Sequence, residues 1–262
     1  MKFLAQWMGA VVFTGLAAHA APFTINVVMG GGLTTTQQAV FTTAANTWMG
    51  LLPSYQAGIN IASLNINASG VAIDGAGGIL GSAGPDTITN QGGFWLSTTG
   101  TMQFDTADLT NMENNGTLLA VILHEMAHVM GFGTLWNLNN VYTDGTGQYT
   151  GANAIAAYRT EYNQLLATFV PVELGGGPGT ANGHWNENDG GGCCTGIISS
   201  NGDMTFDLMT GWLNGGSFIS NTTVASFTDI GYMSAGAAIP EPGTFALFGA
   251  GLAIVGFHRR RR

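Results

Sequence analysis

The sequence has few charged residues, and hardly any of them are basic. Lysine, arginine, aspartate and glutamate make up 8% of the 262 residues, and only six residues are lysine or arginine. Five of these six lie near the two ends, so residues 21–239 keep Arg159 alone against 14 acidic residues, a formal charge of −13. Proteins that bind nucleic acid need lysine and arginine to neutralise phosphates, so we expect no nucleic acid partner.

Cysteine and histidine are also scarce. The two cysteines, Cys193 and Cys194, are adjacent, so they predict a bridge to each other, a bridge to another chain, or a pair of reduced thiols. One of the five histidines lies near each end of the chain, and only His124, His128 and His184 lie between. A histidine site in the folded domain must therefore use these three residues.

The N-terminal end has the composition of a secretory signal peptide. Residues 1–20, "MKFLAQWMGAVVFTGLAAHA", contain one lysine, an apolar run and a closing Ala18-His19-Ala20. This order predicts cleavage before Ala21 and export of the protein.

The C-terminal end, residues 235–262, contains a Pro-Glu-Pro triplet, a short apolar stretch and four closing arginines. The positive-inside rule predicts that the arginines stay in the cytoplasm. This segment resembles the PEP-CTERM sorting tail of Gram-negative bacteria. The resemblance implies a tail helix that anchors the chain transiently in the membrane, recognition by an exosortase-type enzyme, and delivery to the cell surface or extracellular matrix.

The region between the ends is rich in apolar residues and glycine, enough for one large domain over residues 21–234. Its pattern predicts an α+β fold, with a sheet and a strong apolar helix in the N-terminal half and mostly helix and loop in the C-terminal half. The expected strands are 23–29, 59–67 and one or two within 92–106. The expected helices are 34–52, 116–131, 153–169 and 222–233, and residues 74–86 are expected to form a glycine-rich loop.

The helix expected at 116–131 contains the motif H-E-x-x-H, formed by His124, Glu125 and His128. Residues four apart lie on one face of a helix, so both imidazoles can bind one metal ion. Glu125 points beside that ion, where it can take a proton from a water that zinc activates. The motif also arises by chance, so its surroundings must decide.

Two histidines leave a zinc site incomplete, and the third ligand is not local. Gly131 gives H-E-x-x-H-x-x-G, the start of the metzincin pattern, but the usual position of the third histidine is Thr134. His184, in a loop rich in glycine and asparagine, is the remaining histidine of the domain. A gluzincin-like site with Glu161 or Glu173 as the third ligand is the alternative.

The spaced motif, a remote Gly-His-Trp and a later Leu-Met-Thr-Gly together resemble the leishmanolysin family. The stretches "DGAGGILGSAGP", "MQFDTADL", "GFGTLW", "YTGANAIAAY" and "TTVASFTDIGY" add to the likeness, which runs from about residue 59 to 232. The resemblance implies a metzincin-like fold with a twisted mixed sheet, and endopeptidase cleavage of proteins or peptides. It also implies zinc binding by His124, His128 and His184, Glu125 as general base, a methionine turn at Met209, and a chain bend at Gly131.

Three further hypotheses accompany this interpretation. A surface or matrix protein that keeps the scaffold without activity is the alternative function, although it would have no need for all four site residues. Asp189, Asp203 and Asp207 are candidate ligands for a structural calcium ion. A substrate peptide is expected to lie along an edge strand within residues 92–104.

Overall fold

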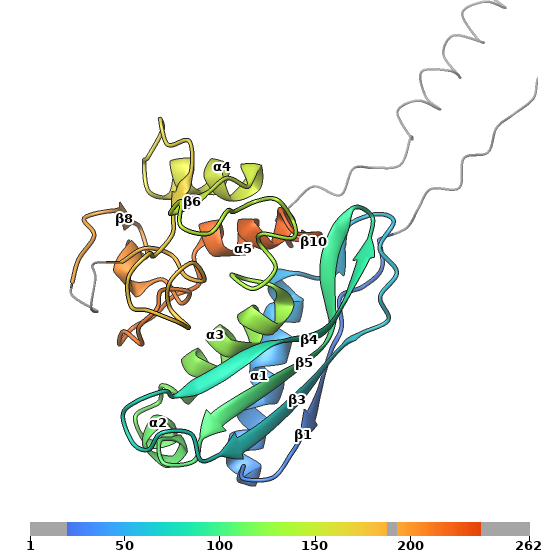
Figure 1. The fold of residues 1–262 in the computed structure, drawn as a ribbon, viewed down its shortest axis with the longest axis vertical. Helices are drawn as coiled ribbons and strands as arrows, with labels where there is room; N and C mark the ends of the chain where they lie inside the picture. The colour runs from blue at the N-terminus through green and yellow to red at the C-terminus, as the bar shows by residue number, and fades with distance from the viewer. Residues whose placement is uncertain (1–19, 188–192, 237–262) are drawn as a thin grey trace, which may run out of the picture. The chain divides into compact units, whose positions relative to one another are not determined.

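A four-stranded sheet forms the framework of the N-terminal half in the computed structural model, which describes residues 20–187 and 193–236 (Figure 1). The strands lie in the order β1 (Ile25–Met29), β3 (Leu64–Val71), β5 (Phe94–Asp105) and β4 (Gly81–Gln91). The first three are parallel, and β4 pairs antiparallel with β5. The predicted mixed sheet is therefore confirmed, and β4 is one of its two edges.

Two long helices, α1 (Thr35–Leu51) and α3 (Leu118–Met130), pack together against the sheet. Thr34 begins α1 with a reciprocal cap: its side chain accepts from the Gln37 backbone, and the Gln37 side chain accepts from the Thr34 N–H. Most of α3 is buried, because it lies against α1, β4 and β5. The short helix α2 (Leu109–Asn114), which the pattern did not predict, lies between β5 and α3.

Short elements and loops make up the C-terminal half. It contains helices α4 (Ala152–Glu161) and α5 (Asn221–Thr228) and a 3-10 turn, η1 (Met204–Phe206). Its strands have two residues each: β6 (Gln148–Tyr149) with β7 (Val170–Pro171), and β8 (Ile198–Ser199) with β9 (Gly202–Asp203). The last strand, β10 (Tyr232–Met233), returns to the N-terminal half and pairs with β2 (Ser54–Tyr55). The predicted α+β architecture in two unlike halves is confirmed.

Several predicted boundaries were wrong. The predicted loop 74–86 already contains the start of β4, and the predicted strand 59–67 lies later, as β3. The predicted helix 153–169 ends as α4 at Glu161, and Asn163 has a left-handed φ of 54° that a helix cannot continue through. The edge strand expected within 92–104 is also wrong: β5 is paired on both sides, and the edge is β4.

The two end segments lie almost wholly outside the described residues. The signal peptide and the tail helix therefore stay predictions. Among residues 20–187 and 193–236, no helix combines the length and apolar character needed to cross a membrane.

Candidate metal centre

Helix α3 places His124 and His128 on one face, one turn apart, as their spacing predicts. Their ring centres are 4.7 Å apart, and their Nε2 atoms are 3.0 Å apart. His128 is buried and His124 is partly buried. The helix ends at Gly131, whose φ of 118° is left-handed and lets the chain turn away.

His184 arrives from a loop 56 residues after His128, and its Nε2 atom lies 3.0 Å from the Nε2 atoms of both helix histidines. The loop is held by backbone pairing on two sides. Trp185 pairs with Val172 on one side and with Thr210 on the other, and its N–H donates to the Met209 carbonyl. The sequence prediction that His184 joins the H-E-x-x-H pair in space therefore agrees with the structure.

Trp185 anchors this loop in the core. Its side chain is fully buried and stacks on Trp136 with ring centres 5.2 Å apart. The indole Nε1–H donates to the Thr223 hydroxyl of α5 at 2.8 Å. The residue next to His184 thus joins the loop to α5 and to the segment that follows α3.

Gly133 brings the loop close to the end of α3, a contact that sequence reasoning missed. Its φ is 71°, and a Cβ there would lie 2.4 Å from the Gly183 carbonyl oxygen. Only glycine permits this approach, because any side chain would collide with the backbone of the residue before His184. The run of glycines around 131–133 and 183 was the available signal, but its tertiary partner could not be read from the sequence.

Each of the three imidazoles uses its second ring nitrogen to hold a backbone carbonyl. The Nδ1 atoms of His124, His128 and His184 lie 2.7, 2.9 and 2.8 Å from the carbonyl oxygens of Leu208, Phe132 and Thr180, respectively. A carbonyl oxygen only accepts, so each Nδ1 must carry a proton. In a neutral ring, the Nε2 atom then has a lone pair and no hydrogen.

The three Nε2 lone pairs face one another at 3.0 Å, where they cannot hydrogen-bond to each other. A cation satisfies all three at once. Zinc–nitrogen bonds of ~2.0–2.1 Å in a tetrahedral site place ligand nitrogens roughly 3.3 Å apart, close to the spacing found here. The donor set therefore fits a metal ion such as zinc, and among the described residues it is the only such group of three ligands.

The electrostatics of the site also favour neutral imidazoles. Burial lowers the pKa of His124, and it lowers that of His184 to about 3. The pKa of His128 lies well below its usual value because of burial and then because of the other two histidines. Neutral imidazole is the form that binds metals, so these residues do not need to lose protons at neutral pH.

Glu125 lies beside the histidines, under the first residue of β4. A Cβ at Gly81 would be 3.0 Å from the Glu125 Cγ atom, so the strand passes directly over this side chain. Burial raises the pKa of the Glu125 carboxyl to about 8. A cation held by the histidines would favour the charged carboxylate and lower that pKa.

Met209 is fully buried in the turn that follows η1. The carbonyl of the preceding residue, Leu208, accepts from the His124 Nδ1–H, and the Met209 carbonyl accepts from the Trp185 N–H. This turn therefore contacts both the helix ligand and the loop that carries His184.

The alternative third ligands lie in other contacts. The Glu161 carboxylate accepts from the backbone of Asn221 and from both the backbone and the hydroxyl of Thr222, where it caps α5. The Glu173 carboxylate accepts from the Gly175 N–H. Neither belongs to the group of ligands gathered in the described structure, so the gluzincin-like arrangement is not formed.

The calcium hypothesis gains no support. Asp203 accepts from the backbone of Thr195, Gly196 and Thr205, and Asp207 accepts from the Thr223 hydroxyl and the Met209 N–H. Both aspartates thus hold backbone turns. The third candidate, Asp189, lies outside the described residues.

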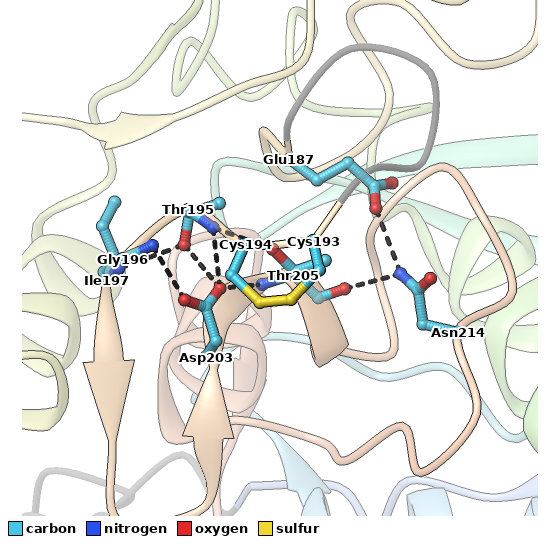
Figure 2. The surroundings of a disulfide bond; sticks show 9 residues. All are labelled: Glu187, Cys193, Cys194, Thr195, Gly196, Ile197, Asp203, Thr205 and Asn214. Carbon is cyan, nitrogen blue, oxygen red and sulfur yellow. Dashed lines mark hydrogen bonds between the residues drawn. A yellow bond between two sulfur atoms is a disulfide. The ribbon is translucent and has the colours of Figure 1, made fainter.

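The two cysteines are joined to each other, the first of the three predicted states (Figure 2). The residues beside them form a hydrogen-bonded network around Asp203. In the same region, the Asn214 amide donates to Glu187 at 3.1 Å and to the Thr205 carbonyl at 2.7 Å. Glu187 also accepts from the Trp212 N–H, which ties the chain beyond His184 to the chain beyond Met209.

An open cleft of about 1070 Å³ contains the three histidines and Glu125. Its lining comes from both halves of the molecule and includes residues 77–83, 178–184, Leu208 and residues 210–213. The site is therefore accessible to a ligand much larger than water.

Comparison with known families agrees with the motifs. The family model for leishmanolysin matches residues 96–241, which include all three histidines, Glu125 and Met209. The model for the PEP-CTERM protein-sorting motif matches residues 238–262, and this motif indicates an exported, surface-associated protein. No curated protein sequence matches the chain. Both resemblances expected from the sequence are confirmed.

Proposed function

The chain belongs to the leishmanolysin family, and on that premise we propose that it is an exported zinc-dependent metalloendopeptidase. The observation that carries the proposal is the convergence of three Nε2 lone pairs at 3.0 Å, each fixed by a carbonyl on the opposite side of its ring. A family of metallopeptidases and a site of three neutral imidazoles point to the same chemistry.

His124, His128 and His184 hold the ion in this proposal. Three histidines that leave one position open are typical of catalytic rather than structural zinc sites. When bound, zinc supplies a Lewis acid that polarises a peptide carbonyl and makes water acidic near neutral pH. The carbonyls of Leu208, Phe132 and Thr180 keep the three rings in the required tautomer and orientation.

Glu125 is the general base. It follows His124 on α3 and lies under Gly81, so its carboxylate borders the open side of the histidine group. It accepts the proton of the attacking water and passes it to the leaving amine. Burial raises the pKa of this carboxyl and a neighbouring cation would lower it, so the two effects oppose each other at a group that must both accept and release a proton.

The substrate is a protein or peptide bound in extended form. Strand β4 is an edge of the sheet, and its first residues, 81–83, line the cleft. An extended peptide can add to such an edge through backbone hydrogen bonds, which read no particular side chain. The cleaved bond would then lie between the edge strand and the histidine group.

The end segments complete the proposal. Residues 1–20 act as a signal peptide, residues 21–234 as the catalytic domain, and residues 235–262 as the sorting tail. The tail anchors the chain transiently in the membrane of a Gram-negative bacterium until an exosortase-type enzyme recognises it.

The test combines zinc content with proteolysis. Purified protein should hold one zinc ion per chain and cleave a casein-type substrate. Glu125→Gln should keep the zinc and lose at least ~100-fold in rate, because it removes the base alone. His184→Ala should bind zinc more weakly, through two histidines only, and lose activity. A wild type that holds no zinc and cleaves nothing would instead favour a non-catalytic surface protein. Two variants that cleave as well as wild type would show that the activity does not come from this site.

A further inference from the structure

Two motifs singled out in the sequence have no role in the metal centre. One is the glycine-rich stretch "DGAGGIL" at residues 74–80, and the other is "FDTAD" at residues 104–108. The structure brings them together at the end of β5, next to the cleft. Their contact is made by two buried aspartates, Asp105 and Asp108, which are 1% and 3% exposed.

The carboxylates of these aspartates hold the backbone of the glycine-rich loop. Asp105 accepts four N–H groups: those of Ile73, Asp74 and Gly75 at 3.2, 2.8 and 2.8 Å on one oxygen, and that of Ala107 at 2.9 Å on the other. One oxygen of Asp108 accepts the Gly77 N–H at 2.8 Å. The Ala107 N–H, followed by those of the loop, keeps the pKa of the Asp105 carboxyl below its ordinary value.

The same loop forms a wall of the cleft. Ile73 and residues 77–80 line it, and the chain then continues directly into the first residues of β4 above Glu125. The backbone N–H of Asp105 also donates to the Leu80 carbonyl, so the end of β5 fixes the loop at both ends. Ile79 is 51% exposed although it is a large apolar side chain, and it lies on this wall.

A loop with this composition needs an external support. Glycine has no side chain to pack and loses more backbone freedom on ordering than other residues. Carboxylates that accept several backbone N–H groups form strong, charge-assisted hydrogen bonds. Asp105 and Asp108 can therefore order the loop where packing cannot.

We propose that Asp105 and Asp108 are positioning residues for substrate binding, which hold the glycine-rich loop as a fixed wall of the cleft with Ile79 in contact with the bound peptide. This inference rests on the proposed peptidase function. It gives the two motifs one shared role: residues 74–80 form the wall of the cleft, and residues 104–108 support that wall.

The competing explanation is that these aspartates only stabilise the fold, and Asp203 offers a matched control. It is another largely buried aspartate whose carboxylate accepts several backbone N–H groups. The residues that it holds, Thr195, Gly196 and Thr205, do not line the cleft, unlike the loop held by Asp105 and Asp108. Asp203→Asn should lower the melting temperature and leave the KM for a peptide unchanged.

Asp105→Asn should raise the KM for an extended peptide roughly tenfold, with one zinc ion still bound and kcat within about twofold of wild type. Amide exchange at residues 73–77 should become faster in the same variant, and this measurement needs no activity. An unchanged KM in folded, zinc-loaded Asp105→Asn, or an equal rise in Asp203→Asn, would overturn the inference.

Ile79→Ala covers the case in which Asp105→Asn does not fold. Its side chain is half exposed, so the melting temperature should stay within experimental error while KM rises about threefold to fivefold. An unchanged KM in this variant would show that Ile79 does not contact the bound peptide. A wild type that cleaves no peptide would defeat the proposed function itself, whereas cleavage with unaffected variants would defeat only this inference.

Discussion

The two halves of the molecule deliver their histidines to one point in different ways. In the N-terminal half, His124 and His128 are set by the period of α3, a helix buried against α1 and the sheet. In the C-terminal half, His184 is set by a loop without regular structure, through backbone pairing, a buried tryptophan and a glycine contact. The helix ligands follow from local sequence, but the loop ligand depends on many distant contacts.

This difference between the halves should appear in mutants. Changes in the N-terminal half should alter stability more than metal binding, because the helix keeps its ligands aligned as long as it is folded. Changes around the loop should alter metal binding even where the domain stays folded.

Acidification of the zinc-free protein should change stability more than any substitution below, and it should act on histidines from both halves. Burial lowers the pKa of all three histidines from an unfolded value near 6.5, and that of His184 to about 3. A lowered folded-state pKa contributes stability that is present above pH ~6.5 and is lost as the pH falls toward the folded pKa. The pKa shift of His184 alone corresponds to a loss of roughly 5 kcal/mol of unfolding free energy once the pH has fallen to its folded pKa.

Denaturant titrations of the zinc-free protein between pH 7.5 and pH 4 measure this loss. His184→Gln should flatten the pH dependence because it removes one of the buried neutral imidazoles. A zinc-free protein whose stability does not change across this window would show that the three histidines are not buried together in the neutral form.

Gly133→Ala should have the next largest effect, a loss of zinc affinity, because it displaces His184 and neither of the helix histidines. The new Cβ would meet the Gly183 carbonyl at 2.4 Å and would sit at a left-handed φ, so the loop must move away with His184. We expect zinc affinity to fall about 100-fold, measured by competition with a chelator.

Gly116→Ala is the control for Gly133→Ala. Gly116 has a φ of 74° and precedes α3, but a Cβ there meets nothing within 4 Å. Gly116→Ala should introduce the same left-handed backbone strain as Gly133→Ala but leave zinc affinity unchanged. Equal losses of affinity in both variants would mean that the contact between Gly133 and Gly183 does not position the ligand.

Two tryptophan variants, one in each half, should have the smallest effect on zinc affinity. They compare the halves most directly because the two side chains are equally buried. Trp185 donates its indole N–H to Thr223 in the C-terminal half, and Trp48 donates its own to the Leu123 carbonyl in the N-terminal half. Both side chains are fully buried. Replacement by phenylalanine should cost about 1–3 kcal/mol of unfolding free energy at either site, because a buried group loses its partner and its packing.

Zinc affinity should distinguish the two variants. Trp185→Phe should weaken binding about tenfold because the loop loses its anchor, and Trp48→Phe should leave binding unchanged. If Trp48→Phe weakens zinc binding as much as Trp185→Phe, the helix and loop ligands do not differ in the way described above.

The difference between the halves also explains what the sequence could predict. The helix around His124 and His128 and its end at Gly131 follow from an apolar period of 3.6 and a glycine at the right place. His184 could be proposed because the domain has no other free histidine and because of a family resemblance. No local pattern indicates that it meets α3, and its contact through Gly133 and Gly183 appears only in the folded chain.

The prediction that the edge strand lies within residues 92–104 was wrong for a physical reason. Strand β4 has the sequence "GSAGPDTITNQ", without the apolar alternation that marks most strands, and it contains Pro85. An edge strand pairs on one side only, and its register shifts just after Pro85, so the proline costs little there. The more apolar β5 has the clearer strand pattern because it is paired on both sides and lies inside the sheet.

X-ray absorption fine structure of the zinc-loaded protein tests the central claim most directly, because it counts the imidazole ligands around the ion. Our account predicts three imidazole nitrogens at ~2.0–2.1 Å in the wild type and two in His184→Ala. The same imidazole count in both proteins would contradict it, because the remote loop would then supply no ligand.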